Sequence, residues 1–131
     1  MTAVPPPAAA TRLVLVVDDD AQVRALLARW ATIAGHTAVV AVDGRDALDS
    51  FARHPGIEAV ITDVRMPGID GPQLVAELRA TRPDLPVVFI SGFTGLDARP
   101  DTRFAPRAAF IEKPFSLRQL TETFEQLVGA N

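Results

Sequence analysis

The chain has 131 residues, of which 48% are hydrophobic, and this suffices for one folded domain around a single core. Its formal net charge of −3 and the lack of a basic run argue against a nucleic-acid surface. There is no cysteine, which excludes disulfides, thiolate catalysis and zinc–cysteine sites and is compatible with a reducing cytosol. No apolar run approaches the roughly 18 residues that a membrane span needs.

Residues 1–11 differ in composition from the rest of the chain. They are rich in proline and alanine, and no basic residue precedes Arg12. A secretory signal peptide begins with basic residues and continues into an unbroken apolar segment, so this stretch does not fit one. We predict a flexible Pro/Ala-rich tail over residues 1–11 and a folded domain over residues 12–131.

From Arg12 onward, short apolar runs alternate with segments of helical periodicity. The runs are mostly continuous and aliphatic, a pattern typical of strands that are buried on both faces of a parallel sheet. They span Leu13–Val17, Thr37–Ala41, Glu58–Thr62, Pro86–Ile90 and Ala108–Ile111.

The helical segments between these runs have recognisable starts. Asp20 and Asp43 precede the first two segments and are expected to cap them. The stretch Phe93–Arg107 is interrupted by Pro100 and Pro106, so any helix there should be short or irregular. Five strands alternating with about five helices predict an α/β fold, in which a doubly wound parallel sheet carries helices on both faces.

Polar residues stand where four of the predicted strands end. In a doubly wound sheet the ligand site lies beyond the carboxyl ends of the strands. Asp18 and Asp19 follow the first strand, and Asp63 ends the third. Ser91 ends the fourth strand and Lys113 follows the fifth. The sequence therefore predicts that these five side chains share one rim of the sheet.

These residue types suit phosphoryl transfer to a carboxylate. Three clustered carboxylates repel one another and are driven toward protonation unless a cation lies among them, and a hard divalent ion such as Mg²⁺ relieves this. Lys113 is the one lysine of the chain against twelve arginines, and its compact ammonium suits a phosphoryl oxygen or a crowded carboxylate. With the hydroxyl of Ser91, the cluster forms a site for a carboxylate nucleophile that accepts a phosphoryl group.

Each residue also has an ordinary structural explanation when taken alone. The aspartates at 18–20 suit a helix cap, Asp63 suits a turn, and Ser91-Gly92 suits another turn. The joint placement at four strand ends favours the site over these separate explanations. His36 and His54 are assigned no role.

Four motifs, in order, resemble those of the receiver domain of two-component response regulators. They are the acidic pair that closes Leu15–Asp19, the phosphoacceptor motif Ile61–Gly71, the switch-hydroxyl motif Phe89–Gly92 and the lysine–proline motif Lys113–Phe115. The resemblance covers Arg12 to about Val128. It implies a flavodoxin-like sheet with strand order 2-1-3-4-5.

The resemblance also implies a role for each site residue. Asp63 would accept phosphate from a sensor histidine kinase or a phosphotransfer protein, Ser91 would be the switch hydroxyl, and Lys113 would contact the phosphoryl group. Phe110 would occupy the switch-aromatic position, although it lacks the hydroxyl that a tyrosine has there. The Lys113-Pro114 bond would be cis. The ligands of Mg²⁺ or Mn²⁺ would be Asp18 through water, Asp19, Asp63 and the backbone carbonyl of Arg65.

Two further expectations concern the phosphorylated state. Arg65 and Phe93 each stand two residues beyond a site residue, and we hypothesise that they control hydrolytic water and so the lifetime of the phosphorylated form. Phosphorylation is expected to rearrange the surface formed by the Phe93–Arg107 segment, the fifth strand and the last helix.

The leading interpretation is a stand-alone, phosphorylation-dependent response regulator, since no residues remain for an output domain after Asn131. Its chemistry would be limited to metal-dependent self-phosphorylation and autodephosphorylation. We expect a cytoplasmic monomer or weak dimer with an unknown downstream protein partner. The alternatives left open are a hybrid-kinase-type receiver that passes phosphate onward and a non-phosphorylated, receiver-like binding module.

Two other classes fit less well. An aspartyl-phosphate phosphatase of the haloacid dehalogenase type has a second aspartate two residues after its nucleophile, and Arg65 stands at that position. A flavin-binding module needs a phosphate-cradling loop after the first strand, where Asp18, Asp19 and Asp20 would repel the phosphate.

Overall fold

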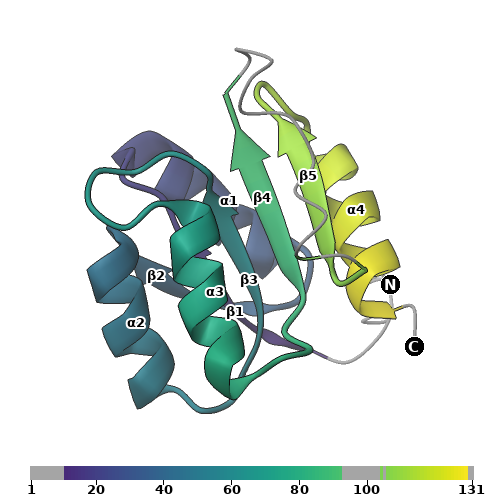
Figure 1. The fold of residues 1–131 in the computed structure, drawn as a ribbon. Coiled ribbons are helices and arrows are strands. Elements are labelled where there is room, and N and C mark those ends of the chain that lie inside the picture. Colours follow the sequence, from purple (N-terminus) through teal and green to yellow (C-terminus); the bar gives the residue numbers. More distant parts are fainter. Residues whose placement is uncertain (1–10, 93–103, 105, 130–131) are drawn as a thin grey trace.

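A computed structural model describes residues 11–92, 104 and 106–129. Strands and helices alternate along the described chain (Figure 1). They are β1 Leu13–Val17, α1 Ala21–Ile33, β2 Thr37–Ala41, α2 Gly44–Arg53, β3 Ile57–Asp63, α3 Gly71–Thr81, β4 Val87–Ser91, β5 Ala108–Glu112 and α4 Leu117–Gly129.

The five strands form one sheet in the order β2-β1-β3-β4-β5, and every neighbouring pair is parallel. The predicted doubly wound sheet is therefore confirmed, including its strand order. The described residues contain four helices, against the roughly five expected. Most of the Phe93–Arg107 segment, including Pro100, lies outside the described residues. Within the described ranges, every helix is too short or too polar to span a lipid bilayer.

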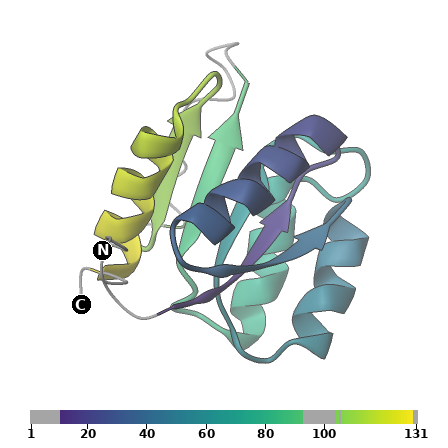
Figure 2. The same cartoon turned by 180° about the vertical axis from the view of Figure 1, so that it is seen from behind.

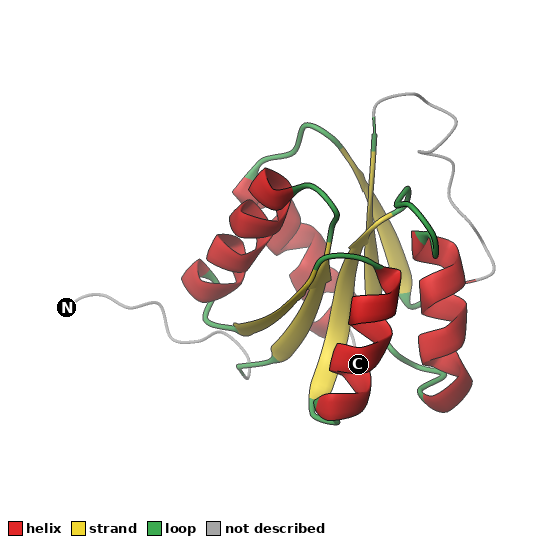
Figure 3. Cartoon of the chain, turned by 90° about the vertical axis from the view of Figure 1, so that its left-hand side faces the viewer, coloured by secondary structure: helices red, strands yellow, loops and turns green. Residues whose placement is uncertain are grey.

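Helices cover both faces of the sheet. The helices α2 and α3 lie on one face, and α1 and α4 lie on the other (Figures 1 and 2). Figure 3 shows the sheet between these two helical layers. Because side chains alternate along a strand, Leu15 and Val17 pack with the α2 and α3 cluster, whereas Val14 and Val16 pack with α1 and α4. All four residues are fully buried, as expected for a strand covered on both faces.

Three helices begin with an aspartate cap close to the carboxyl ends of the strands. The Asp20 carboxylate accepts hydrogen bonds from the backbone N–H groups of Gln22 and Val23, and Asp43 accepts one from Asp46. Both predicted caps are confirmed. At α3, Asp70 and Gln73 form a reciprocal capping box. Each cap contributes about 1 kcal/mol and fixes where the helix leaves the rim.

Candidate functional site

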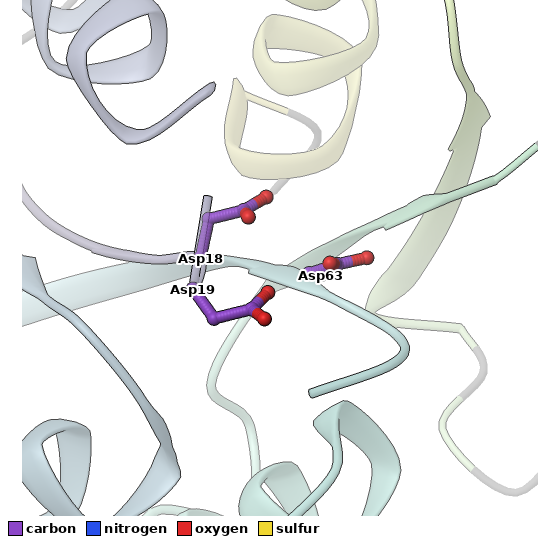
Figure 4. Close-up of side chains that lie close together, drawn as sticks. All are labelled: Asp18, Asp19 and Asp63. Carbon is purple, nitrogen blue, oxygen red and sulfur yellow. The ribbon is translucent and has the colours of Figure 1, made fainter. Parts of the chain in front are cut away.

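Three carboxylates meet where β1 and β3 end. Asp18 and Asp19 directly follow β1, and Asp63 is the last residue of the neighbouring β3. One ligand oxygen from each side chain lies within 4.8 Å of the others (Figure 4). The predicted grouping at the carboxyl ends of the strands therefore holds for these three side chains.

Lys113 supplies the cation of the cluster. Its Nζ lies 3.8 Å from Asp18 Oδ2 and 3.7 Å from Asp63 Oδ2. Its backbone N–H donates to the carbonyl oxygen of Ser91 at 2.8 Å, which holds the residue beside the end of β4. The peptide bond to Pro114 is cis, as the resemblance implied. The ammonium thus bridges two carboxylates from different strands.

Burial makes the charges of this cluster costly. Asp18 is fully buried, and the Asp63 side chain is 10% exposed. The pKa of Asp63 is raised to about 6, chiefly by burial and also by the neighbouring Asp18 charge, while Lys113 and the Arg65 backbone N–H act against this rise. Burial also raises the pKa of Asp18, opposed by the Asp20 backbone N–H, which donates to its Oδ1 at 2.8 Å, and by Lys113. A further cation would favour the charged form of both groups.

The donor set fits a hard divalent cation. All three ligand groups are carboxylates, which suit Mg²⁺ or Mn²⁺ better than a soft metal. The buried Asp18 Oδ2 is ion-paired with Lys113 at 3.8 Å but has no hydrogen-bond partner among the described residues, so it can still accept one. Asp19 is exposed, which leaves access from solvent. With all three carboxylates ionised, their negative charges exceed the single positive charge of Lys113, so the net charge of the cluster favours binding of a cation.

Ser91 and Phe110 occupy different parts of the same sheet face. Ser91 is buried at the end of β4, and its Oγ has no hydrogen-bond partner within the described part of the chain. Ser91 and Phe89 point to the same face because strand side chains alternate. Phe110 pairs with Phe89 across β4 and β5 and stacks on it, with ring centroids 4.8 Å apart. Phe110 therefore belongs to an aromatic stack, which Phe104 extends at 5.4 Å from Phe89, and not to the acidic cluster.

The loop after Asp63 lines an open cavity of about 500 Å³. Val64, Arg65, Met66, Pro67 and Asp70 form its walls. The cavity lies beside Asp63, the predicted phosphoacceptor, because its lining begins with the next residue of the chain. The Arg65 carbonyl remains a predicted metal ligand, and Phe93, the other residue expected to control hydrolysis, lies outside the described residues.

Gly71 has a part in the site that the sequence did not reveal. A Cβ at this position would collide with the carbonyl oxygen of Asp63 and lie 3.1 Å from Val64 Cα. The Gly71 N–H donates to the Val64 carbonyl at 2.9 Å. Glycine thus allows α3 to begin against the end of β3. The sequence showed Gly71 only as the last residue of the phosphoacceptor motif, in a turn-rich stretch, and its contact with Asp63 depends on the path of the folded chain.

Arg24 is a second residue that sequence reasoning missed. Its Nη1 donates to the carbonyl oxygen of Asp18 at 2.7 Å. The residue lies one turn into α1, so the helix that follows β1 also fixes the backbone of the first acidic residue. The only feature of the sequence that could have indicated this contact is the position of Arg24 near the start of the helix that follows Asp18.

Comparison with known proteins agrees with this geometry. The family model of the response regulator receiver domain matches residues 14–125. The chain is 35% identical to sensor kinase CckA of Brucella abortus over 116 residues, covering 88% of this chain and 12% of that protein. It is 36% identical to response regulator MprA of Mycolicibacterium vanbaalenii over 115 residues, covering 88% of this chain and 49% of that protein. The chain thus spans half or less of the length of these curated relatives.

A solved structure is similar over nearly its whole length. The receiver domain of NtrX from Brucella abortus superposes with a TM-score of 0.80 at 32% identity, covering 90% of this chain and 99% of that one. The parallel sheet and the acidic cluster at its carboxyl rim define a receiver domain of two-component signalling. The chain belongs to the response regulator receiver domain family. Receiver domains interact with histidine kinases or phosphotransfer proteins.

Proposed function

We propose that this chain is a phosphorylation-dependent receiver in which Asp63 accepts a phosphoryl group from a phosphohistidine of a sensor kinase or phosphotransfer protein. The supporting observation is the position of Asp63, 3.7 Å from the Lys113 ammonium and within 4.8 Å of two further carboxylates. A carboxylate oxygen of Asp63 attacks phosphorus and forms the new O–P bond. The N–P bond of the phosphohistidine breaks, and its electron pair returns to the imidazole.

The neighbours of Asp63 have distinct roles in this proposal. Lys113 contacts the phosphoryl group and offsets its negative charge. Asp19, Asp63 and the backbone carbonyl of Arg65 would hold Mg²⁺ or Mn²⁺ directly, and Asp18 would do so through water. Such an ion would neutralise charge on the transferring oxygens. The cost of burying uncompensated carboxylates, reflected in the raised pKa of Asp63, supports this ion requirement.

In this proposal, Ser91 and Phe110 are the residues that change their interactions when Asp63 is phosphorylated. The buried Ser91 Oγ donates a hydrogen bond to the phosphoryl group once it is present, which supplies the partner that it lacks within the described residues. Phe110 responds through its stack with Phe89, the neighbour of Ser91 on the same face. Moving a two-state domain from mostly off to mostly on requires about 5.5 kcal/mol of differential stabilisation. A few charge-assisted hydrogen bonds beside a bound ion reach that order.

Phosphorylation by a small donor tests the proposal. The chain is incubated with Mg²⁺ and acetyl phosphate, and its intact mass is measured. We expect an increase of one phosphate that is absent in Asp63→Asn and present in Asp49→Asn, a matched change at an exposed carboxylate on α2. An increment that persists in Asp63→Asn would contradict the assignment. A chain that gains no phosphate from any donor or metal would instead be a receiver-like binding module.

A second candidate is a receiver that passes phosphate onward. The 35% identity to sensor kinase CckA favours it. Mixing the phosphorylated chain with a histidine phosphotransfer protein distinguishes the two, because onward transfer moves the phosphate to the histidine protein while Asp63 loses it. The downstream partner, the monomeric or weakly dimeric state and the division into a tail over 1–11 and a domain over 12–131 remain part of this proposal.

A further inference from the structure

Arg24 connects α1 to the peptide group between the two acidic residues that follow β1. Its Nη1 donates to the Asp18 carbonyl oxygen at 2.7 Å, at the short end of the range for N–H···O hydrogen bonds. The Arg24 backbone N–H donates to the Asp20 carbonyl at 2.9 Å, which closes the first turn of α1. The half-buried side chain of Arg24 therefore returns from the helix to a carbonyl six residues earlier in the chain.

The bond from Arg24 is the shorter of two hydrogen bonds that place the Asp18 main chain. The Asp18 N–H donates to the Ala41 carbonyl of β2 at 3.4 Å, which exceeds the usual range of about 2.7–3.2 Å. The bond from the guanidinium is charge-assisted, and such bonds are roughly twice as strong as neutral ones. Asp18 is fully buried, so solvent does not compete with Arg24 for this oxygen. The orientation of the Asp18 carbonyl therefore depends mainly on Arg24.

The bonded carbonyl belongs to the peptide group that joins Asp18 to Asp19. A peptide group is planar, so a bond that fixes its oxygen also limits rotation of the plane that contains both Cα atoms. Both carboxylates turn toward the side of the cluster where Asp63 lies (Figure 4). The Asp18 side chain is also held by the Asp20 N–H at 2.8 Å, whereas Asp19 is exposed. The direction of the Asp19 side chain thus relies on the peptide plane that Arg24 holds.

We propose that Arg24 is a positioning residue for the divalent cation of the site, because it holds the peptide plane from which Asp18 and Asp19 project. This inference rests on the proposed function, in which Asp19 and Asp63 are direct ligands of Mg²⁺. Mg²⁺ requires nearly octahedral ligand geometry at about 2.0–2.1 Å, so rotation of this plane weakens its binding. Removal of a group that orients a metal ligand usually lowers metal affinity about 10–100-fold.

The sign of the effect separates positioning from simple electrostatics. Arg24 is a cation near an anionic cluster, so its charge alone opposes the binding of a second cation. Loss of the charge would therefore tighten Mg²⁺ binding, whereas loss of the hydrogen bond to the Asp18 carbonyl would weaken it. The choice of ion gives a second distinction, because Ca²⁺ accepts a more flexible ligand geometry than Mg²⁺. A positioning role predicts a larger effect on Mg²⁺ than on Ca²⁺.

Titration of the isotope-labelled full chain with each ion at constant ionic strength, followed by amide NMR shifts, tests the proposal. Arg24→Met keeps an apolar side chain without charge or donors. We expect its dissociation constant for Mg²⁺ to rise about 10-fold or more, and that for Ca²⁺ to rise less. Arg24→Lys keeps the charge and one ammonium donor group, and it should show a smaller rise of the same kind. This second variant preserves the test if Arg24→Met does not fold.

Arg29→Met is the matched control for these titrations. Arg29 is an exposed arginine on the same helix, so its substitution makes the same charge change without removing the bond to Asp18. It should bind Mg²⁺ like the parent chain. An unchanged or lower dissociation constant for Mg²⁺ in both Arg24 variants would overturn the proposal and leave Arg24 only the anchoring of α1. An equal rise for Mg²⁺ and Ca²⁺ would also overturn it, because a general disruption of the site affects both ions.

Failure of this inference can be distinguished from failure of the proposed function. If the parent chain binds Mg²⁺ and gains one phosphate at Asp63 from acetyl phosphate, an absence of the expected Arg24 effect counts against the positioning role alone. A parent chain that binds no Mg²⁺ would contradict both.

Discussion

At Gly71 the backbone of α3 passes so close to β3 that no side chain fits. A Cβ there would meet the backbone of Asp63 and Val64, which cannot rotate away as a flexible side chain would. We expect Gly71→Ala to lower the free energy of unfolding by about 1–3 kcal/mol, the usual cost of overpacking. Urea unfolding measures this. Gly129→Ala is the control, since a Cβ at Gly129 meets nothing within 4 Å. Equal stability of the two variants would contradict the close approach.

His36 is buried between aromatic rings, and it directly precedes β2, at the end of the sheet opposite the acidic cluster. It is 8% exposed and lies 5.1 Å from the Phe124 ring and 5.9 Å from the Trp30 ring. Its Nδ1 accepts a hydrogen bond from the Arg12 backbone N–H at 3.1 Å. Burial lowers the pKa of His36, and the Arg12 charge adds to this. The Glu125 carboxylate acts in the opposite direction, but at 3.7 Å from Nε2 it is too distant for a hydrogen bond.

The stability of the domain should therefore depend on pH through His36. Because its folded pKa lies below the unfolded value of about 6.5, the unfolded state takes up the proton first as the pH falls. The contribution is present above about pH 6.5 and is lost as the pH falls through the folded pKa. We expect the decrease in unfolding free energy from about pH 8 to about pH 5 to be smaller in His36→Gln than in the parent chain.

The matched control for this titration is His54→Gln. It removes the histidine that ends α2 and should retain the pH dependence that His36 causes. The buried carboxylates of the acidic cluster are the same in all these variants. The comparison therefore separates the contribution of His36 to the pH dependence of stability from theirs. An identical pH dependence in His36→Gln and the parent chain would show that burial of this imidazole does not affect folding.

At the scale of elements, Arg79 joins one helix to two strand connections. Its Nε and Nη2 donate to the Leu85 carbonyl at 3.1 and 2.8 Å, just before β4. Its Nη1 donates to the Phe104 carbonyl at 2.9 Å, and its Nη2 to the Arg107 carbonyl at 2.8 Å. The planar guanidinium can reach all three acceptors at once, because its donors form a rigid fork. Arg79 thus fixes α3 against the starts of β4 and β5.

We expect Arg79→Lys to lower the unfolding free energy by about 1–3 kcal/mol, because a single ammonium leaves some of these carbonyls unsatisfied. Urea unfolding is again the measurement. Arg118→Lys is the matched control, since the Arg118 side chain is 88% exposed and pairs only with Glu122 across one turn of α4 among the described residues. A change within about 0.5 kcal/mol is expected there. Equal effects at both positions would mean that the three carbonyl contacts of Arg79 contribute little.

At the scale of the whole molecule, the sequence predicts the parts of the fold that depend on local pattern. Continuous apolar runs locate the strands, and the rule for the carboxyl ends of parallel strands groups Asp18, Asp19 and Asp63. The same reasoning could not find Gly71 or Arg79. Their contacts join segments through the folded path of the chain, and neither residue interrupts a hydrophobic period. Long-range backbone contacts of this kind have no signature in a single sequence.

The acidic cluster should also link metal binding to the stability of the entire domain. An ion that binds the folded chain alone raises the unfolding free energy by about 1.4 kcal/mol for each tenfold increase above its dissociation constant. We expect this response to Mg²⁺ at constant ionic strength, measured by urea unfolding. In Asp19→Asn, which removes an exposed ligand from the cluster, the response should begin at higher Mg²⁺ concentration. Asp49→Asn carries the same charge change on α2 and should respond like the parent chain. If both variants respond alike, Mg²⁺ acts by screening charge and not by binding at the ends of β1 and β3.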